Sequence, residues 1–226
     1  MSNLPFYISF VFLLTVLLTI FIFYSATKKS KATLIILFVW LLIQGIISLT
    51  GFYKVTDNNP PRFALLVLPP LIFIIMLFIS RKGRNFIDSL DIKTLTILHA
   101  VRIPVEIVLL WLSFQQVVPQ IMTFEGRNFD ILAGLTAPVI FYFGFNKEQF
   151  GRKMILVWNF LCIGLLINIV SLAVLSAPFP FQRLAFDQPN IAVLYFPYVW
   201  LPCCIVPLVL FSHLVAIRQL LRNKNA

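Results

Sequence analysis

Residues 94–114 form an apolar run that is long enough to cross a lipid bilayer, yet the run contains His99, Arg102 and Glu106. On an α-helix, which turns about 100° per residue, these three side chains fall within roughly 60° of one another and form one polar stripe. Hydrocarbon does not tolerate ionisable side chains that face lipid. The stripe therefore predicts that other apolar helices surround this segment and bury its polar face.

The composition places the whole chain in the same class. Of the 226 residues, 60% are hydrophobic and 12% are charged, whereas a soluble domain has roughly 25% charged residues. The net charge is +10, but the basic residues stand in short clusters between apolar runs, and no continuous basic face could follow a phosphate backbone. We therefore expect a membrane protein that contacts lipids and does not bind nucleic acid.

Seven segments are predicted to span the membrane, at residues 5–24, 32–53, 62–80, 93–114, 130–145, 153–175 and 196–219. A hydrocarbon core of ~30 Å needs about 20 residues at ~1.5 Å per residue, and six segments are close to this length or above it. The fifth segment is short, at sixteen residues. The expected fold is all-α, a seven-helix bundle that forms a single domain over residues 1–226.

Basic residues predict the orientation of this bundle. With seven crossings, thirteen basic residues fall on one side, four fall on the other, and Arg102 lies within the membrane. The thirteen are Lys28, Lys29, Lys31, Arg81, Lys82, Arg84, Lys93, Lys147, Arg152, Lys153, Arg218, Arg222 and Lys224, and the four are Lys54, Arg62, Arg127 and Arg183. Because basic residues favour the cytoplasmic side, the N-terminus is predicted outside and the C-terminus inside.

Two interpretations of the polar stripe are open. Arg102 and Glu106 are four residues apart and can pair within one helix, which would lower the cost of burying both charges. Alternatively, the stripe is a site for a small or lipidic ligand, where Arg102 contacts an anionic group and Glu106 or His99 exchanges a proton. Pro104 leaves the carbonyl of Ala100 without its helical donor, which adds an acceptor to either arrangement.

The two histidines of the chain, His99 and His213, lie at similar depths, roughly 9 and 8 Å from the inner basic ends of their helices. If they face each other, they can ligate the iron of a b-type haem, whose propionates would be held by Arg81, Lys82, Arg84 or Lys93. The alternative is two buried histidines with separate hydrogen bonds. No metal site is predicted, because Glu106 is about 10 Å from His99 along the helix.

The outer connections, residues 115–129 and 176–195, are long and contain polar groups near the membrane surface. Their charged candidates are Glu125, Arg127, Asp130, Arg183 and Asp187. Two carboxylates there could carry out acid–base chemistry on a lipid or glycan. The alternative is that the acidic groups cap helices and pair with the arginines, and Asp130 stands where an N-cap is expected. No motif assigns a catalytic residue, so an enzymatic activity stays open.

The runs MTFEGRNFDILAGLTAP (residues 122–138) and FDQPNIAVLYFP (residues 186–197) resemble segments of an uncharacterised group of bacterial multi-pass proteins. The resemblance covers most of the chain. It implies a bacterial inner-membrane location and supplies no activity. The expected function is therefore binding of a small or lipidic ligand with proton coupling, in transport or sensing. A haem electron-transfer protein and a lipid- or glycan-modifying enzyme are the alternatives.

Overall fold

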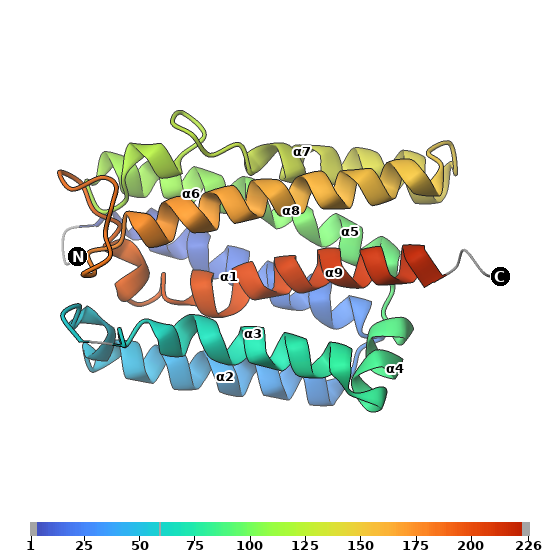
Figure 1. Cartoon of the computed structure of the whole chain (residues 1–226), viewed down its shortest axis with the longest axis horizontal. Helices are drawn as coiled ribbons and strands as arrows, with labels where there is room; N and C mark the ends of the chain where they lie inside the picture. The colour runs from blue at the N-terminus through green and yellow to red at the C-terminus, as the bar shows by residue number, and fades with distance from the viewer. Residues whose placement is uncertain (1–3, 59, 223–226) are drawn as a thin grey trace.

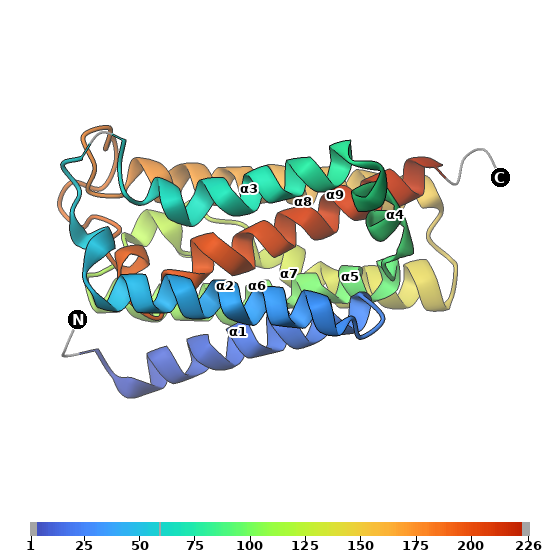
Figure 2. The ribbon, with the colours of Figure 1, turned by 90° about the horizontal axis from the view of Figure 1, so that it is seen from below.

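The computed structural model describes residues 4–58 and 60–222, and within these ranges the chain forms helices and no β-strand. Figures 1 and 2 show an elongated bundle whose long helices run along one axis. The chain enters at one end of this axis and leaves at the other (Figure 1). The prediction of an all-α fold is confirmed.

Four helices run without interruption, and they are α1 (Phe6–Ala26), α2 (Lys31–Leu49), α3 (Ala64–Ile79) and α8 (Arg152–Leu175). These segments are apolar on nearly every side, which is typical of helices in a nonpolar solvent rather than in water. Ser30 starts α2 as an N-cap, because its hydroxyl accepts a hydrogen bond from the backbone N–H of Thr33. A short 3₁₀ turn, η1 (Phe52–Lys54), follows α2.

Prolines change the winding of the other spans. The predicted fourth segment consists of α5 (Ile92–Leu98), the 3₁₀ turn η2 (His99–Val101) and α6 (Arg102–Phe114). Because Pro104 has no N–H, the carbonyl of Ala100 lacks its helical donor, and the chain tightens at η2.

Two further spans contain π-helical turns. Helix α7 (Ile131–Val139) continues after Pro138 as η4 (Ile140–Asn146). Near the C-terminus, η6 (Leu201–Ile205), which contains Pro202, leads into α9 (Val206–Arg222). Two 3₁₀ turns, η3 (Gln120–Met122) and η5 (Ala192–Leu194), lie in the connections before these spans.

Helix α4 (Arg81–Ser89) was not predicted, because it is charged and amphipathic and hydropathy does not detect it. It is bent by 94° from α3 and folds across one end of the bundle (Figure 2). The hydroxyl of Ser80 caps it by accepting a hydrogen bond of 3.0 Å from the N–H of Gly83. Asp88 joins α4 to the end of α9 through ion pairs with Arg218 and Arg222.

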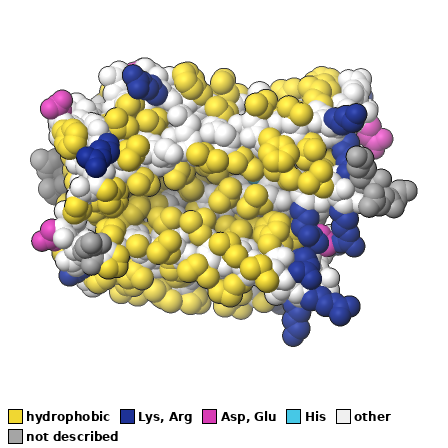
Figure 3. Space-filling model, viewed as in Figure 1, with side chains coloured by type: hydrophobic (Ala, Val, Ile, Leu, Met, Phe, Trp, Pro, Cys, Tyr) yellow, Lys and Arg dark blue, Asp and Glu magenta, His cyan; other side chains and the backbone are white. Residues whose placement is uncertain are grey.

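Within the part of the chain that the structure describes, five helices are long and apolar enough to cross a membrane, and the bent α3–α4 pair would make a sixth. The α7–η4 segment, Ile131–Asn146, is apolar but shorter. In Figure 3 hydrophobic side chains cover the middle of the visible face, and lysines and arginines lie toward its ends, with more of them at the end where α4 lies. These features are compatible with a membrane protein. Of the thirteen basic residues assigned to the inside, Lys224 lies outside the described residues.

Candidate functional site

The structure brings the two histidines together inside the bundle. His99 comes from η2 and His213 from α9, and both side chains are fully buried. Their rings stack with centroids 3.7 Å apart and planes inclined by 12°. The indole of Trp158, on α8, lies with its centroid 5.6 Å from each imidazole.

Arg102 connects this pair to the rest of the site. Its Nη2 lies 3.2 Å from Nε2 of His213, and its Nη1 lies 3.0 Å from Oδ1 of Asp130. A guanidinium can only donate, so Nε2 of His213 accepts and the imidazole hydrogen is on Nδ1. That Nδ1–H donates to Oδ1 of Asn159 at 2.8 Å, and the Asn159 amide in turn donates to the carbonyl of Ile155. One chain of contacts therefore joins α8, α9 and α6.

Arg102 does not form an ion pair with Glu106 among the described residues, so the intrahelical pair considered above is replaced by the contact with Asp130. The Glu106 carboxylate instead accepts hydrogen bonds from Nδ2 of Asn128 on both oxygens, at 2.7 and 2.6 Å. Asn128 also donates to the carbonyl of Met122, 3.0 Å away. Both charged residues of the stripe, Arg102 and Glu106, are thus paired with residues that lie more than twenty positions further along the chain, Asp130 and Asn128.

Asp130 reaches the centre because α7 starts part-way along the bundle (Figure 1). The preceding connection turns inward, and Oδ1 of Asn128 fixes its end by accepting a hydrogen bond of 2.9 Å from the N–H of Asp130. Asp130 is the residue before α7, but its side chain makes no capping bond, so the N-cap prediction is wrong. Gly134 allows the close approach, since a Cβ there would lie 2.9 Å from Cγ1 of Ile103 and 3.3 Å from Cβ of Arg102.

We call these buried groups the polar cluster: His99, Arg102, Glu106, Asn128, Asp130, Asn159 and His213. Sequence reasoning missed Asn128 and Asn159, since each is a single uncharged amide without a motif. The signal for Asn159 is a hydrogen-bonding side chain inside an apolar run, which predicts an inward direction. Nδ1 of His99 and Nε of Arg102 find no hydrogen-bond partner within residues 4–58 and 60–222. Such buried groups cost about 1–3 kcal/mol each when they stay unpaired.

The other outer-loop candidates lie apart from the cluster. Glu125, Arg127, Arg183 and Asp187 are all exposed, and none takes part in an ion pair within the described ranges. The two outer connections contact each other, because Nε2 of Gln188 donates to the carbonyls of Val118 and Ser113 at 2.6 and 2.9 Å. A surface enzyme built on Glu125 and Asp187 stays a prediction.

The histidine pair as placed does not fit a bis-histidine haem. Axial ligands reach one iron from opposite faces of the porphyrin, whereas the rings of His99 and His213 are in face-to-face contact. Both nitrogens of His213 also have partners, Arg102 and Asn159. Haem remains a prediction that an absorption spectrum of the purified protein would test, since bound haem gives a Soret band.

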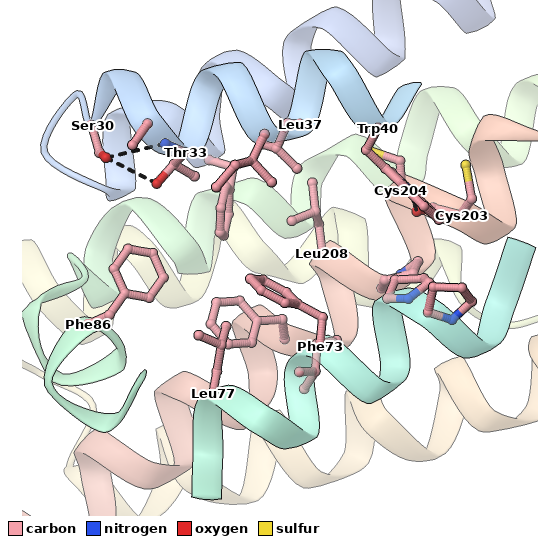
Figure 4. A pocket seen from close by; sticks show the side chains of 18 residues that line it. Ser30, Thr33, Leu37, Trp40, Phe73, Leu77, Phe86, Cys203, Cys204 and Leu208 are labelled. Atoms are coloured by element: carbon pink, nitrogen blue, oxygen red, sulfur yellow. Dashed lines mark hydrogen bonds between the residues drawn. The ribbon is translucent and has the colours of Figure 1, made fainter. Parts of the chain in front are cut away.

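An apolar pocket of about 550 Å³ lies on another side of α9, between α2 and α3 (Figure 4). It belongs to the size range of ligand sites, ~300–1,000 Å³, and its lining includes Trp40 of α2, Phe73 of α3 and Leu208 of α9. Helices α2 and α3 scarcely contact each other directly. None of the predicted site residues lines this pocket, because its walls are ordinary apolar side chains.

Comparison with curated proteins and with solved structures finds no match to this chain. A family model matches residues 60–221, which include every member of the polar cluster and the α3 and α9 walls of the pocket. The matched region covers well over half of the chain, so the protein belongs to the family described as domain of unknown function DUF8737.

Proposed function

We propose that this protein is a multi-pass protein of a bacterial inner membrane that binds a lipidic ligand in the apolar pocket and couples this binding to a proton held in the polar cluster. The observation that carries the proposal is the position of α9. This one helix supplies Leu208 and Phe211 to the pocket and His213 to the cluster.

Helix α9 faces the apolar pocket on one side and the polar cluster on the other. Phe211 and His213 are two residues apart, which turns their side chains about 200° away from each other around the helix. His213 is tied to α6 through Arg102 and to α8 through Asn159. A change of charge in the cluster alters these ties, and the resulting shift of α9 changes the width of the pocket. Occupation of the pocket acts on the cluster in return, because such coupling is reciprocal.

The charges of the cluster support a bound proton. It contains one guanidinium, Arg102, and two carboxyl groups, Glu106 and Asp130, all buried. An unbalanced charge in a low-dielectric interior is costly. The polar cluster is therefore electrically neutral when one of its two carboxyl groups carries a proton. Loss of this proton leaves the cluster with a net negative charge. Asn128 binds Glu106 from the connection that leads to the outer end.

The proposed topology has seven crossings, with the N-terminus outside and the C-terminus inside. The passes are α1, α2, α3, α5–α6, α7–η4, α8 and α9, and α4 lies across the inner end. Their courses along the long axis (Figures 1 and 2), the emergence of the chain at opposite ends, and the larger number of basic residues at the α4 end all support this arrangement.

Cysteine labelling tests whether α7–η4, the shortest of the seven proposed passes, crosses the membrane. The native cysteines are buried, so a membrane-impermeant maleimide should react in intact cells with Glu125→Cys and not with Glu148→Cys. Labelling of Glu148→Cys from outside would show that α7–η4 does not cross the membrane, which would leave six crossings. Lys82→Cys serves as a second inner control.

Fluorescence of Trp40 tests the coupling, because Trp40 lines the pocket. The full-length protein would be placed in phospholipid vesicles whose acyl chains carry bromine, which quenches indole on contact, and Trp40→Phe would define the background. We expect Trp40 quenching to change reversibly between pH 5 and 8 and to lose this pH dependence in Glu106→Gln. The matched control is Asp187→Asn, which neutralises an exposed carboxylate and should leave the titration unchanged. A pH titration of Trp40 quenching that is the same in the wild type, Glu106→Gln and Asp187→Asn would disprove the coupling.

A further inference from the structure

We propose that the pocket holds one acyl chain of an anionic glycerophospholipid whose headgroup lies at the basic inner end of the bundle, beside the α1–α2 turn and α4. The proposal rests on the membrane location and on the pocket of the proposed function. It does not depend on proton coupling in the polar cluster.

The shape of the pocket suits a chain that lies parallel to the helices. On α2 the lining follows the spacing of one helical face, with Thr33, Ile36, Leu37 and Trp40, and on α3 it does the same, with Pro70, Phe73, Ile74 and Leu77. Each stripe covers seven residue steps, or about 10 Å along the helix axis. Ile36 and Phe73 are about half exposed, so the slot opens between the lipid-facing surfaces of α2 and α3. A bilayer lipid enters such a slot sideways without leaving the membrane.

The inner end of the slot is polar and basic. Figure 4 shows Ser30 and Thr33 at one end of the pocket, with Phe86 of α4 facing them across it. Lys82 stands four residues before Phe86 and therefore shares its face of α4. Lys31 follows Ser30 directly, and both lysines are exposed.

The turn between α1 and α2 adds two more charges in an unusual conformation. Lys28 and Lys29 both have left-handed backbones, with φ of 54° and 62°. This region favours glycine and asparagine and is disfavoured for lysine. Both side chains are exposed beside Ser30. These two residues close the C-terminus of α1, where the N–H groups of Lys28 and Lys29 donate to the carbonyls of Ser25 and Tyr24. The turn thereby places two basic residues directly before Ser30, which lines the pocket.

Charge decides which lipid is selected. Inside a bilayer an apolar slot has no preference among acyl chains, because the surrounding lipid is equally apolar. Selection must therefore come from the headgroup, and a basic cluster at the membrane surface favours anionic lipids. Lys28, Lys29, Lys31 and Lys82 supply this cluster, and the one acidic residue of α4, Asp88, is engaged by Arg218 and Arg222.

Native mass spectrometry of the full-length protein tests the inference. The detergent-solubilised protein would be incubated with equal amounts of phosphatidylglycerol and phosphatidylcholine that carry identical acyl chains. We expect phosphatidylglycerol to be retained at least about fivefold more than phosphatidylcholine, the preference that a single basic contact of this kind supplies. Soluble glycerol phosphate should not compete, because it has no acyl chain.

The decisive variant is Lys28→Asn with Lys29→Gly, Lys31→Gln and Lys82→Gln, which removes all four lysines of the cluster. Asparagine and glycine adopt positive φ more readily than lysine, so the turn is relieved of strain while its charge is removed. We expect the preference for phosphatidylglycerol to fall below about twofold, less than one basic contact supplies. Lys153→Gln is the matched control, since it removes a basic residue from the inner end of α8, which does not line the pocket. Leu208→Trp should fill the slot and reduce retention of both lipids.

Equal retention of the two lipids by the wild-type protein would overturn the proposal, and so would a loss of preference in Lys153→Gln as large as in the quadruple variant. Competition by glycerol phosphate would identify a phosphate site without a lipid chain. A lipid preference that persists while Trp40 quenching shows no pH dependence would disprove the proton coupling alone. Trp40 quenching that depends on pH, together with equal retention of the two lipids, would disprove the selection of an anionic lipid and leave the proton coupling standing.

Discussion

The two sides of α9 differ in the kind of contact that they make with the rest of the bundle. Toward α5, α6, α7 and α8, the helix contributes His213 to a cluster in which buried groups meet partners from four segments of the chain. Toward α2 and α3, it contributes Leu208 and Phe211 to a slot whose two outer helices scarcely contact each other. The first side is held by a network of directional contacts. The second is held mainly by packing, with one hydrogen bond of 2.9 Å from Nε1 of Trp40 to the carbonyl of Cys203.

This difference teaches where an apolar helical bundle tolerates open space. A buried ionisable group needs its partners at fixed positions, so the elements around it must be close and rigid. An apolar slot exposes nothing that lipid cannot cover, so helices can stand apart there at little cost. We therefore expect substitutions on the cluster side to be more damaging than comparable substitutions on the pocket side.

The largest effect is expected at Arg102. Arg102→Leu leaves two buried carboxyl groups without their cation and should destabilise the fold by roughly 3–5 kcal/mol. Thermal or denaturant unfolding of the detergent-solubilised protein would measure the change. Arg102→Leu combined with Asp130→Leu removes both members of the ion pair and should recover part of the loss. Equal stability of the single variant and the wild type would contradict the central role of this pair.

Leucine truncations compare the two sides directly. Leu98 is fully buried at the end of α5, next to the histidine pair, and Leu98→Ala should cost roughly 2–5 kcal/mol by cavity formation. Leu37 lines the open slot, and Leu37→Ala should cost less than about 1 kcal/mol, because fewer packing contacts are lost. Unfolding midpoints of the two variants provide the measurement. Equal losses would mean that the slot is packed as tightly as the cluster.

Two glycine substitutions test the close approach that forms the cluster. In Gly134→Ala, the new Cβ would lie 3.1 Å from the backbone nitrogen of Ile103, so α7 must move away from α6 at a cost of about 1–3 kcal/mol. Gly164→Ala is the control, since a Cβ there meets nothing within 4 Å and alanine stabilises a helix by up to ~1 kcal/mol. Thermal unfolding of both proteins should show opposite shifts. Two shifts of the same sign would disprove the tight contact.

The smallest effect is expected at the end of the bundle where α4 meets α9. The bidentate hydrogen bonds from Arg218, at 2.9 and 3.1 Å, hold the pKa of Asp88 below its ordinary value. Because the folded-state pKa is depressed, this stabilisation is present above the unfolded-state pKa of about 3.9 and is lost as pH falls through the folded-state value.

Asp88→Asn should therefore lower stability by roughly 0.5–1 kcal/mol near neutral pH. The difference from the wild type should disappear in acid, and unfolding midpoints measured against pH would show both effects. A difference that stays constant from neutral pH down to acid would contradict the ion-pair account. Ser89→Ala, a neutral change at an exposed position of the same helix, serves as the control.

The polar stripe shows how far sequence reasoning reaches at this site. The period of the helix placed His99, Arg102 and Glu106 on one face, and the cost of burying them required an inward direction. The partner of Arg102 could not be derived in this way, because Asp130 is 28 residues further along the chain and was assigned to the outer surface. Its inward position follows from the late start of α7 and from the absence of a side chain at Gly134.

Local chemistry along the chain was sufficient to determine the all-α class, the positions of the long apolar segments and the tightening of the helix before Pro104, because each depends on residues that are neighbours in sequence. Tertiary structure alone decided the pairing of Arg102 with Asp130, the stacking of His99 on His213 and the slot between α2 and α3. These features depend on how far apart and at what angle whole helices pack, and that distance is a property of all their side chains together.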